Sequence, residues 1–292
     1  MSETTAGMRR KIAGAGDLQS VVRTMKAVAA SSIGQYEESV SALADFNRAV
    51  ELGLGACFRE SGPAPLTPQR KAPGAIGAVV FGSDQGLVGQ FNDVVADFAI
   101  KTLSALPGKH EVWAVGERAY ERLADAGLPV RGVSPVPNSV KAITPLVGQI
   151  LLESEARQRR GIAELHLFHN RPKSGAIYEP VDQRLLPLDD EWRRKLAALP
   201  WPTANLPEVI GGGTATLRAF ISGYLFVSIF RACAESLAAE NASRLSAMQR
   251  ADKNIDELLE DLNRTFHRSR QNGIDEELFD VVSGFEALTT KG

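Results

Sequence analysis

Cysteine is nearly absent from this chain of 292 residues, which contains only Cys57 and Cys233. The two lie far apart and show no Cys-x-x-Cys or Cys/His spacing, so the sequence excludes a disulfide framework and a thiolate zinc site. We therefore expect the reducing cytoplasm as the compartment. The first residues also lack the basic start and apolar run of a signal peptide, and we expect the mature chain to begin there.

Neither sign of charge is in surplus, because the formal net charge is -2. A nucleic-acid-binding domain needs a basic excess to neutralise phosphates, so we expect no nucleic acid as a partner. Long hydrophobic runs are also missing. The most apolar window, residues 219–230, is bounded by Arg218 and Arg231 and is shorter than the roughly 20 residues that a membrane span requires. We do not expect it to cross a bilayer alone.

The common catalytic and nucleotide-binding motifs are missing too: there is no Walker sequence, no Gly-x-Gly-x-x-Gly, no His-Glu-x-x-His and no Gly-x-Ser-x-Gly. One glycine-rich loop, residues 82–92, follows a predicted strand and precedes a predicted helix, where backbone amides could bind an anion. The loop holds no lysine or arginine. A tight structural turn or an intersubunit contact loop is therefore favoured over phosphate binding, and all three interpretations stay open.

Two histidines, His166 and His169, are three residues apart on a predicted strand. Side chains at that spacing point to opposite faces of a sheet, so joint metal binding is disfavoured and each is expected to be an ordinary packed or surface histidine. We expect no catalytic, cofactor-binding or metal-ligating residues and no cofactor in this chain.

Proline is missing from residues 8–58 and from residue 208 to the end, and both stretches carry apolar residues in steps of three and four. This pattern predicts two long helices with coiled-coil seams. At about 1.5 Å per residue they would be roughly 75 Å and 110 Å long. Between them, short β-type runs alternate with helical stretches, which predicts a Rossmann-like α/β domain with a largely parallel sheet.

The expected organisation is thus an N-terminal helix in residues 1–60, an α/β domain in residues 75–190 and a C-terminal helix in residues 208–292. The first helix ends where the α/β domain begins and the last begins where it ends, so the two most simply run antiparallel, seam against seam. The longer last helix would overhang its partner with Leu278, Val281, Val282, Phe285 and Leu288. A lone amphipathic helix of this kind implies a partner that surrounds or grips it.

Several short motifs occur along the chain. The first predicted helix contains Lys-Ile-Ala at 11–13, Thr-Met-Lys at 24–26 and Val-Ala-Ala-Ser at 28–31, and the glycine-rich loop reads Ser-Asp-Gln-Gly-Leu-Val-Gly at 83–89 with Asn92. Together with residues 235–248, 263–265, 270–271, 274 and 282–288, these motifs resemble those of one known family, the gamma subunit of F-type ATP synthases. The first set is similar to its first-helix signature, the loop to its Ser-Asp-x-Gly-Leu-Cys-Gly-x-x-Asn motif, and the C-terminal residues are the most specific matches.

This resemblance implies the central rotor stalk of a rotary complex, in which an antiparallel coiled coil turns inside a ring of alternating alpha and beta subunits. The α/β domain would contact the epsilon subunit and the membrane c-ring. Catalytic residues belong to beta in this family, so the chain would be a non-catalytic subunit of a rotary ATP synthase or ATPase. The positions matching Met25, Arg244, Arg270 and Gln271 would contact the catalytic subunits.

The resemblance further implies a peripheral location on the cytoplasmic side of the bacterial inner membrane, with membrane contact only through the complex. Some positions depart from the family pattern: Ser32-Ile33-Gly34-Gln35 replaces a basic stretch, Val88 replaces a cysteine and Asp275 replaces a threonine. These departures indicate a divergent branch, for which we consider the alternate bacterial complex proposed to pump sodium ions. A self-contained α/β nucleotide-binding enzyme with helical tethers and a passive coiled-coil scaffold are the competing interpretations.

Overall fold

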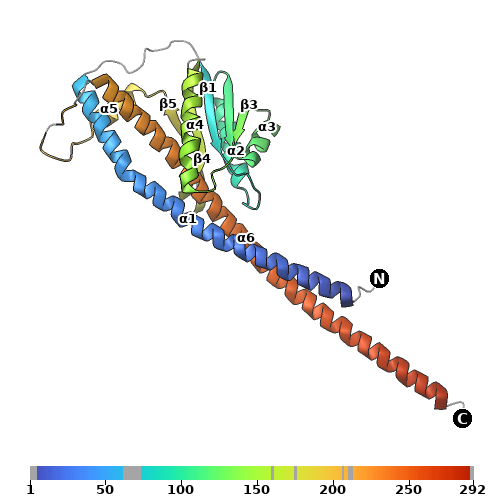
Figure 1. Cartoon of the computed structure of the whole chain (residues 1–292). Coiled ribbons are helices and arrows are strands. Elements are labelled where there is room, and N and C mark those ends of the chain that lie inside the picture. The colour runs from blue at the N-terminus through green and yellow to red at the C-terminus, as the bar shows by residue number, and fades with distance from the viewer. Residues whose placement is uncertain are drawn as a thin grey trace. The chain divides into compact units, whose positions relative to one another are not determined.

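The computed structural model describes residues 5–61, 74–158, 161–173, 176–205, 207–209 and 213–289. Its contacts divide the chain into two compact units, which are described separately below. One contains residues 1–28 and 245–292, and the other contains residues 29–244. Two long helices, α1 (Thr5–Ser61) and α6 (Gly213–Thr289), contribute to both units (Figure 1). At about 1.5 Å per residue these helices have the extent expected from the proline-free stretches.

The unit of residues 29–244 contains a five-stranded sheet in the order β3-β2-β1-β4-β5. Strands β1 (Ala75–Phe81), β2 (His110–Val115), β3 (Val130–Ser134) and β4 (Ile162–Lys173) run parallel, and β5 (Ala176–Leu186) pairs antiparallel with β4. The connecting helices are α2 (Phe91–Ala105), α3 (Glu117–Asp125) and α4 (Val140–Gln158). This confirms the expected α/β domain with a largely parallel sheet.

Alternating side chains of β1 divide the core between the two faces of the sheet. Ala78 and Val80 pack under α2 and α3, with residues such as Val95 and Leu123. Val79 and Phe81 face α4, α1 and α6, where the core contains the side chains of Tyr36, Ile143, Val147, Ile229, Phe230 and Leu237. Segments of the long helices therefore form one of the two layers that bury this sheet.

A separate apolar cluster joins α1, α5 (Asp190–Ala197) and α6. Leu54 and Phe58 of α1 are buried there, and Trp192 of α5 packs edge-on against Phe58 and Tyr224. Gly53 allows α1 and α6 to approach closely, since it has no side chain: a Cβ built on Gly53 would lie 2.4 Å from the ring of Phe220. Any larger residue at position 53 would force this ring to move.

The apolar part of α6 contains one window of 18 residues that meets a length and composition test for a membrane span, with a mean hydropathy of 1.4 and 39% of the window buried. Residues 219–230, the window considered from the sequence, are by themselves shorter than a membrane span. The apolar window is longer than this because α6 continues past both flanking arginines. A soluble core helix passes the same test. Ile229, Phe230 and Cys233 lie buried in the core beneath the sheet, which gives this composition a packing role.

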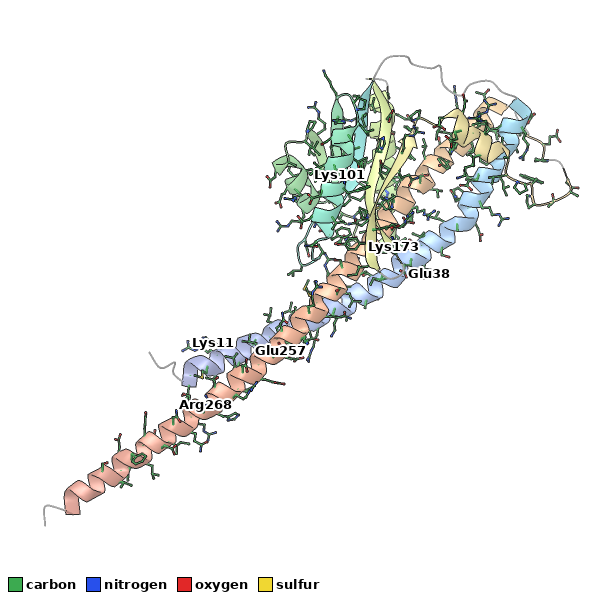
Figure 2. The ribbon with its side chains drawn as sticks, turned by 180° about the vertical axis from the view of Figure 1, so that it is seen from behind. Lys11, Glu38, Lys101, Lys173, Glu257 and Arg268 are labelled. Atoms are coloured by element: carbon green, nitrogen blue, oxygen red, sulfur yellow. The ribbon has the colours of Figure 1, made fainter. Side chains whose placement is uncertain are left out.

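In the unit of residues 1–28 and 245–292, α1 and α6 pair antiparallel. Val22 packs with Met248 and Ile255, and Arg9 lies over the ring of Phe266, 5.4 Å from its centroid. Figure 1 shows the α6 end continuing beyond the α1 end in this unit. Charged side chains such as Glu257 and Arg268 project outward from α6 (Figure 2). The predicted antiparallel seam and the predicted overhang are both confirmed within this unit.

Candidate functional site

The glycine-rich loop between β1 and α2 is held as a tight turn by its own polar side chains. The Asn92 amide donates to Ser83 Oγ at 2.8 Å, and Asn92 Oδ1 accepts from the Ser83 backbone at 2.9 Å. Asp84 accepts from the backbone N–H groups of Glu117 and Val136 at 3.1 and 2.9 Å. The loop after β1 is thus hydrogen-bonded to the segments that follow β2 and β3. The backbone N–H groups of Glu117 and Val136 already donate to the Asp84 carboxylate and are not free for an anion.

Two glycines permit this close approach of three chain segments. A Cβ on Gly82 would lie 2.4 Å from the Cβ of Ala119, and a Cβ on Gly116 would lie 2.7 Å from the Ser83 nitrogen. Gly116 also has a φ of 106°, which side chains with a Cβ rarely adopt. Leu87 at the loop tip has a φ of 63° and is 62% exposed. Its exposed apolar side chain supports the interpretation of this tip as a contact loop.

The crevice that a parallel sheet offers to ligands is filled by α6. In the order β3-β2-β1-β4-β5 the winding reverses between β1 and β4, and ligands of such folds bind at that point, outside the carboxyl ends of the strands. Here Val88 and Phe91 pack against Ala239 of α6, and Ser243 Oγ donates to the Val88 carbonyl at 2.5 Å. The helix occupies the place of a nucleotide, which disfavours phosphate binding by this loop.

The two histidines of β4 have carboxylate partners that the sequence did not reveal. His166 Nδ1 lies 2.8 Å from Asp182 Oδ1, and His169 Nε2 lies 2.9 Å from Glu235 Oε2 on α6. Burial lowers the pKa of His166, but hydrogen bonds to Asp182 and Glu164 outweigh it and hold that pKa above its ordinary value. Both histidines are buried. Within the described ranges no group of three or more His, Cys, Asp or Glu could hold a metal ion.

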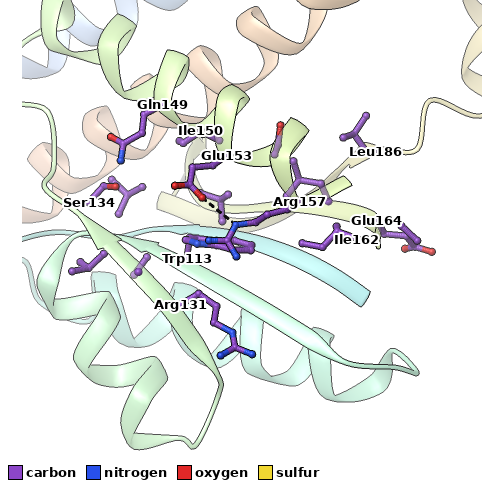
Figure 3. Close-up of a pocket in the computed structure, with 18 residues that line it drawn as sticks. Trp113, Arg131, Ser134, Gln149, Ile150, Glu153, Arg157, Ile162, Glu164 and Leu186 are labelled. Carbon is purple, nitrogen blue, oxygen red and sulfur yellow. Dashed lines mark hydrogen bonds and ion pairs between the residues drawn. The ribbon is translucent and has the colours of Figure 1, made fainter. Parts of the chain in front are cut away.

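A cavity of about 130 Å³ lies between α4 and the sheet (Figure 3). Its polar wall is the Arg157 guanidinium, which stacks 4.0 Å from the Trp113 ring centroid and pairs at 3.0 Å with both Glu111 and Glu153. Ile150 and Leu165 form part of its apolar lining. Arg157 is paired with two carboxylates, and Arg131, the other arginine of the lining, lies 3.9 Å from Glu111, so both arginines of this cavity already have a carboxylate partner.

Met25 lies in the seam between α1 and α6. It packs against the cluster of Val22, Met248 and Ile255 and is half-buried. The next residue, Lys26, pairs with Asp252 of α6 at 2.7 Å. Met25 therefore contributes to the pairing of the two helices and still presents part of its side chain outward.

Arg244 has a structural partner that sequence reasoning missed. Its Nη2 donates to Glu240 Oε1 at 2.7 Å, one turn earlier on α6, and its side chain is 15% exposed. Burial raises the pKa of Glu240 and Asp84 adds to this, while Arg244 opposes both, and the net shift is upward. The spacing of four residues was visible in the sequence, but the burial of the carboxylate was not.

Arg270 and Gln271 lie on the exposed surface of α6 in the other unit. They follow Phe266, whose ring is covered by Arg9 of α1. Beyond them, α6 exposes Ile274, Leu278, Phe279, Val281 and Val282. Phe285 and Leu288, also predicted for this overhang, have side chains outside the described residues. The structure thus brings Met25, Arg270 and Gln271 into one unit and Arg244 into the other.

Comparison with known proteins gives matches over nearly the whole chain. The family model described as ATP synthase matches residues 4–288. The ATP synthase gamma chain of Nitrosomonas eutropha is 26% identical over 296 residues, covering 96% of this chain and 98% of that protein. The ATP synthase gamma chain of a Nocardioides species is 28% identical over 295 residues, covering 96% and 95%.

Solved structures show the same fold. A chain of the Euglena gracilis mitochondrial ATP synthase, in a structure of OSCP, F1 and c-ring, matches with a TM-score of 0.66 at 16% identity, covering 97% of this chain and 94% of that one. A chain from the central stalk and c-ring of the Tetrahymena thermophila mitochondrial enzyme matches with a TM-score of 0.57 at 20% identity, covering 79% and 99%.

Proposed function

Because this chain belongs to the ATP synthase family, we propose that it is the gamma subunit, the central rotor stalk that couples ion flow through a membrane ring to ATP synthesis or hydrolysis in a catalytic head. The observation that carries this proposal is the antiparallel pairing of α1 and α6, two helices that lie at opposite ends of the chain. Val22 packs on Met248 there, and Lys26 pairs with Asp252.

The mechanism is mechanical coupling. An asymmetric shaft meets each catalytic subunit with a different surface, so each subunit is stabilised in a different conformation with a different nucleotide affinity. Turning the shaft moves every site through these conformations. The filled crevice beside Val88 and Ala239 supports this division of labour, because this chain then has no need to bind nucleotide itself.

Its partners are the alpha and beta subunits around the shaft, the epsilon subunit and the membrane c-ring. Residues 1–60 and 208–292 would supply the shaft, and residues 75–190 the domain at its foot. The chain is part of a membrane-bound complex, and we place it on the cytoplasmic side of a bacterial plasma membrane. The curated relatives that support this placement are bacterial gamma chains.

Four residues are proposed to contact the catalytic subunits: Met25, Arg244, Arg270 and Gln271. The exposure of Arg270 and Gln271 supports this role, because a guanidinium on the shaft surface can form charge-assisted hydrogen bonds to carboxylates or carbonyls of beta. The exposed apolar residues Leu278, Phe279 and Val281 supply a surface for the alpha and beta subunits that would surround the end of α6.

Reconstitution tests the proposed function. Purified alpha and beta subunits are mixed with and without this chain, and ATP hydrolysis and the size of the complex are measured. We expect one copy of the chain to assemble with the alpha and beta subunits and to change the rate of hydrolysis. Turnover by the isolated chain would instead support the enzyme interpretation. Assembly without any change in the rate would support a passive scaffold.

A further inference from the structure

Glu240 and Arg244 form a nearly enclosed ion pair on α6. The donor–acceptor distance is 2.7 Å, and the side chains are 7% and 15% exposed. Glu240 Oε2 is buried and has no hydrogen-bond partner within the described part of the chain. A buried carboxylate with one bonded oxygen depends strongly on its single counter-charge.

The groups facing Glu240 from neighbouring elements make this dependence stronger. Tyr36 of α1 is buried, and its pKa is raised by burial and then by the charge of Glu240. Asp84, in the loop after β1, adds a second negative charge, and Cys233 on α6 is a buried thiol. Among these groups Arg244 alone stabilises the charged form of Glu240.

We propose that Glu240 is a positioning residue for Arg244, and that it takes up a proton whenever Arg244 turns away to a carboxylate of a catalytic subunit. The inference rests on the proposed function, since it needs Arg244 to meet such a subunit. The Arg244 side chain is only 15% exposed where it holds Glu240, so its guanidinium has to swing out of this enclosed position, and leave Glu240, to reach a carboxylate on a neighbouring subunit.

The exchange balances as a proton transfer from solvent. In the resting state the guanidinium and the Glu240 carboxylate are both charged. When Arg244 leaves, one proton from the surrounding water binds to Glu240, the carboxyl becomes neutral and no uncompensated charge stays buried. When Arg244 returns, that proton goes back to water. Burial favours the neutral carboxyl in the absence of its cation.

The competition between the two carboxylates keeps the contact with the catalytic subunit short-lived. When Arg244 returns to the shaft, Glu240 releases its proton and the ion pair forms again, which favours the return, so each contact breaks before the next rotational step. In Glu240→Gln the amide oxygen still accepts a hydrogen bond, but the attraction of the anion is lost. Arg244 then stays longer on the partner, and we expect kcat for ATP hydrolysis to fall about fivefold while KM is unchanged.

A double-mutant cycle in the assembled complex tests whether Glu240 acts through Arg244. We expect Glu240→Gln combined with Arg244→Ala to be no slower than Arg244→Ala alone. Glu121→Gln, which breaks an exposed pair of α3 with Arg118, is the matched control and should leave kcat unchanged. If the fold-losses in kcat of the two single variants multiplied in the double variant, Glu240 would act independently of Arg244, and the proposal would be overturned.

The pH dependence of the same complexes supplies a readout that a merely structural role would not move. Protonation of Glu240 makes the wild type resemble Glu240→Gln, so the wild type should show a fall in kcat on the acid side that the variant lacks. If Glu240→Gln does not fold, Arg244→Lys and Arg244→Ala decide the question: the acid-side fall should persist in the lysine variant and vanish in the alanine variant. An acid-side fall that persists in Arg244→Ala would overturn the proposal.

Proton uptake on assembly separates this inference from the proposed function. Calorimetry in buffers of different ionisation enthalpy counts the protons bound when the chain joins alpha and beta. We expect the wild type to bind up to one proton more than Glu240→Gln. Equal uptake in an active complex would overturn the role of Glu240 and leave the stalk function intact, whereas failure to assemble would count against the stalk function itself.

Discussion

Lys26 on α1 and Asp252 on α6 form an ion pair between the two long helices, with 2.7 Å between Nζ and Oδ2. Arg23, one turn earlier on α1, donates to the other oxygen of Asp252 at 3.1 Å. The hydrogen bond from Lys26 is the main cause that keeps the pKa of Asp252 below its ordinary value. Two cations on one helix therefore hold one carboxylate of the other, which fixes their register.

This register predicts an intrachain cross-link. Cysteines placed at Lys26 and Asp252 should form a disulfide within one chain under mild oxidation, detected by altered mobility on non-reducing gels. Because both helices would turn together, the cross-linked chain should retain ATP hydrolysis in the complex. Cysteines at Lys26 and Asp261, more than two turns further along α6, are the control and should not cross-link. Efficient cross-linking only between chains would indicate a scaffold dimer.

Loss of the proposed shaft contacts should slow turnover more than it impairs assembly. We expect Arg244→Ala, and separately the Arg270→Ala/Gln271→Ala pair, to assemble with alpha and beta but to lower kcat about tenfold, which corresponds to about 1.4 kcal/mol of lost coupling. Arg118→Ala on α3 removes another exposed arginine and should leave turnover unchanged. Unchanged hydrolysis and ion pumping in both shaft variants would mean that shape alone transmits the rotation.

The raised pKa of His166 predicts a pH-dependent contribution to stability. Protonated His166 is favoured in the folded chain by Asp182 and Glu164. Its contribution is therefore fully present below the unfolded pKa of about 6.5 and is lost as pH rises through the higher folded pKa. The difference in urea unfolding midpoint between wild type and His166→Gln should shrink over that range. His267→Gln, at an exposed histidine, serves as the control, and a difference that is constant with pH would contradict the assignment.

Asp84 should matter for folding although its side chain is exposed. Asp84→Ala removes the acceptor of two backbone N–H groups, at Glu117 and Val136, and we expect a loss of about 1–2 kcal/mol, similar to the loss of a helix cap. Denaturant unfolding of the isolated chain measures this loss. Asp125→Ala, near the end of α3, is a comparison at another acidic residue, and equal stability of the two variants would show that the Asp84 bonds contribute little.

The isolated chain should bind neither ATP nor ADP. The expected nucleotide position next to Val88 is taken by α6, and Ser243 already donates to the Val88 carbonyl. Titration calorimetry with Mg²⁺ present should therefore show no saturable heat. A micromolar site would revive the enzyme interpretation, and its loss in a variant of the loop would place that site at residues 82–92.

Most of the fold could be predicted because its signals are local. Proline-free seams gave α1 and α6, and alternation of β-type and helical runs gave the sheet with its connecting helices. The length of β4 was not predicted: the strand continues to Lys173 and pairs there with Ala176 of β5. This extension depends on the pairing of β4 with β5 in a hairpin, and the apolar pattern of a strand alone does not show where such pairing ends.

The electrostatic partners could not be predicted in the same way. His169 meets Glu235 across 66 positions in sequence, and only the packing of α6 on β4 brings them together. Glu240 likewise interacts electrostatically with Tyr36 of α1 and with Asp84 of the loop after β1, which are far from it in sequence. Sequence motifs indicated that Arg244 was of interest, but the carboxylate that holds it became visible only when three distant segments were packed.

The occupation of the sheet crevice by α6 has a consequence for torsional stiffness. Ala239 and Ser243 are buried against Val88 and its carbonyl, and His169 of β4 bonds Glu235 of the same helix. A twisting load that enters through the sheet therefore reaches α6 through close-packed side chains and buried polar bonds. Close-packed interiors have low compressibility and transmit strain. Residues 29–244 should consequently turn as one stiff body, in which rotation of the sheet and rotation of the helix are the same movement.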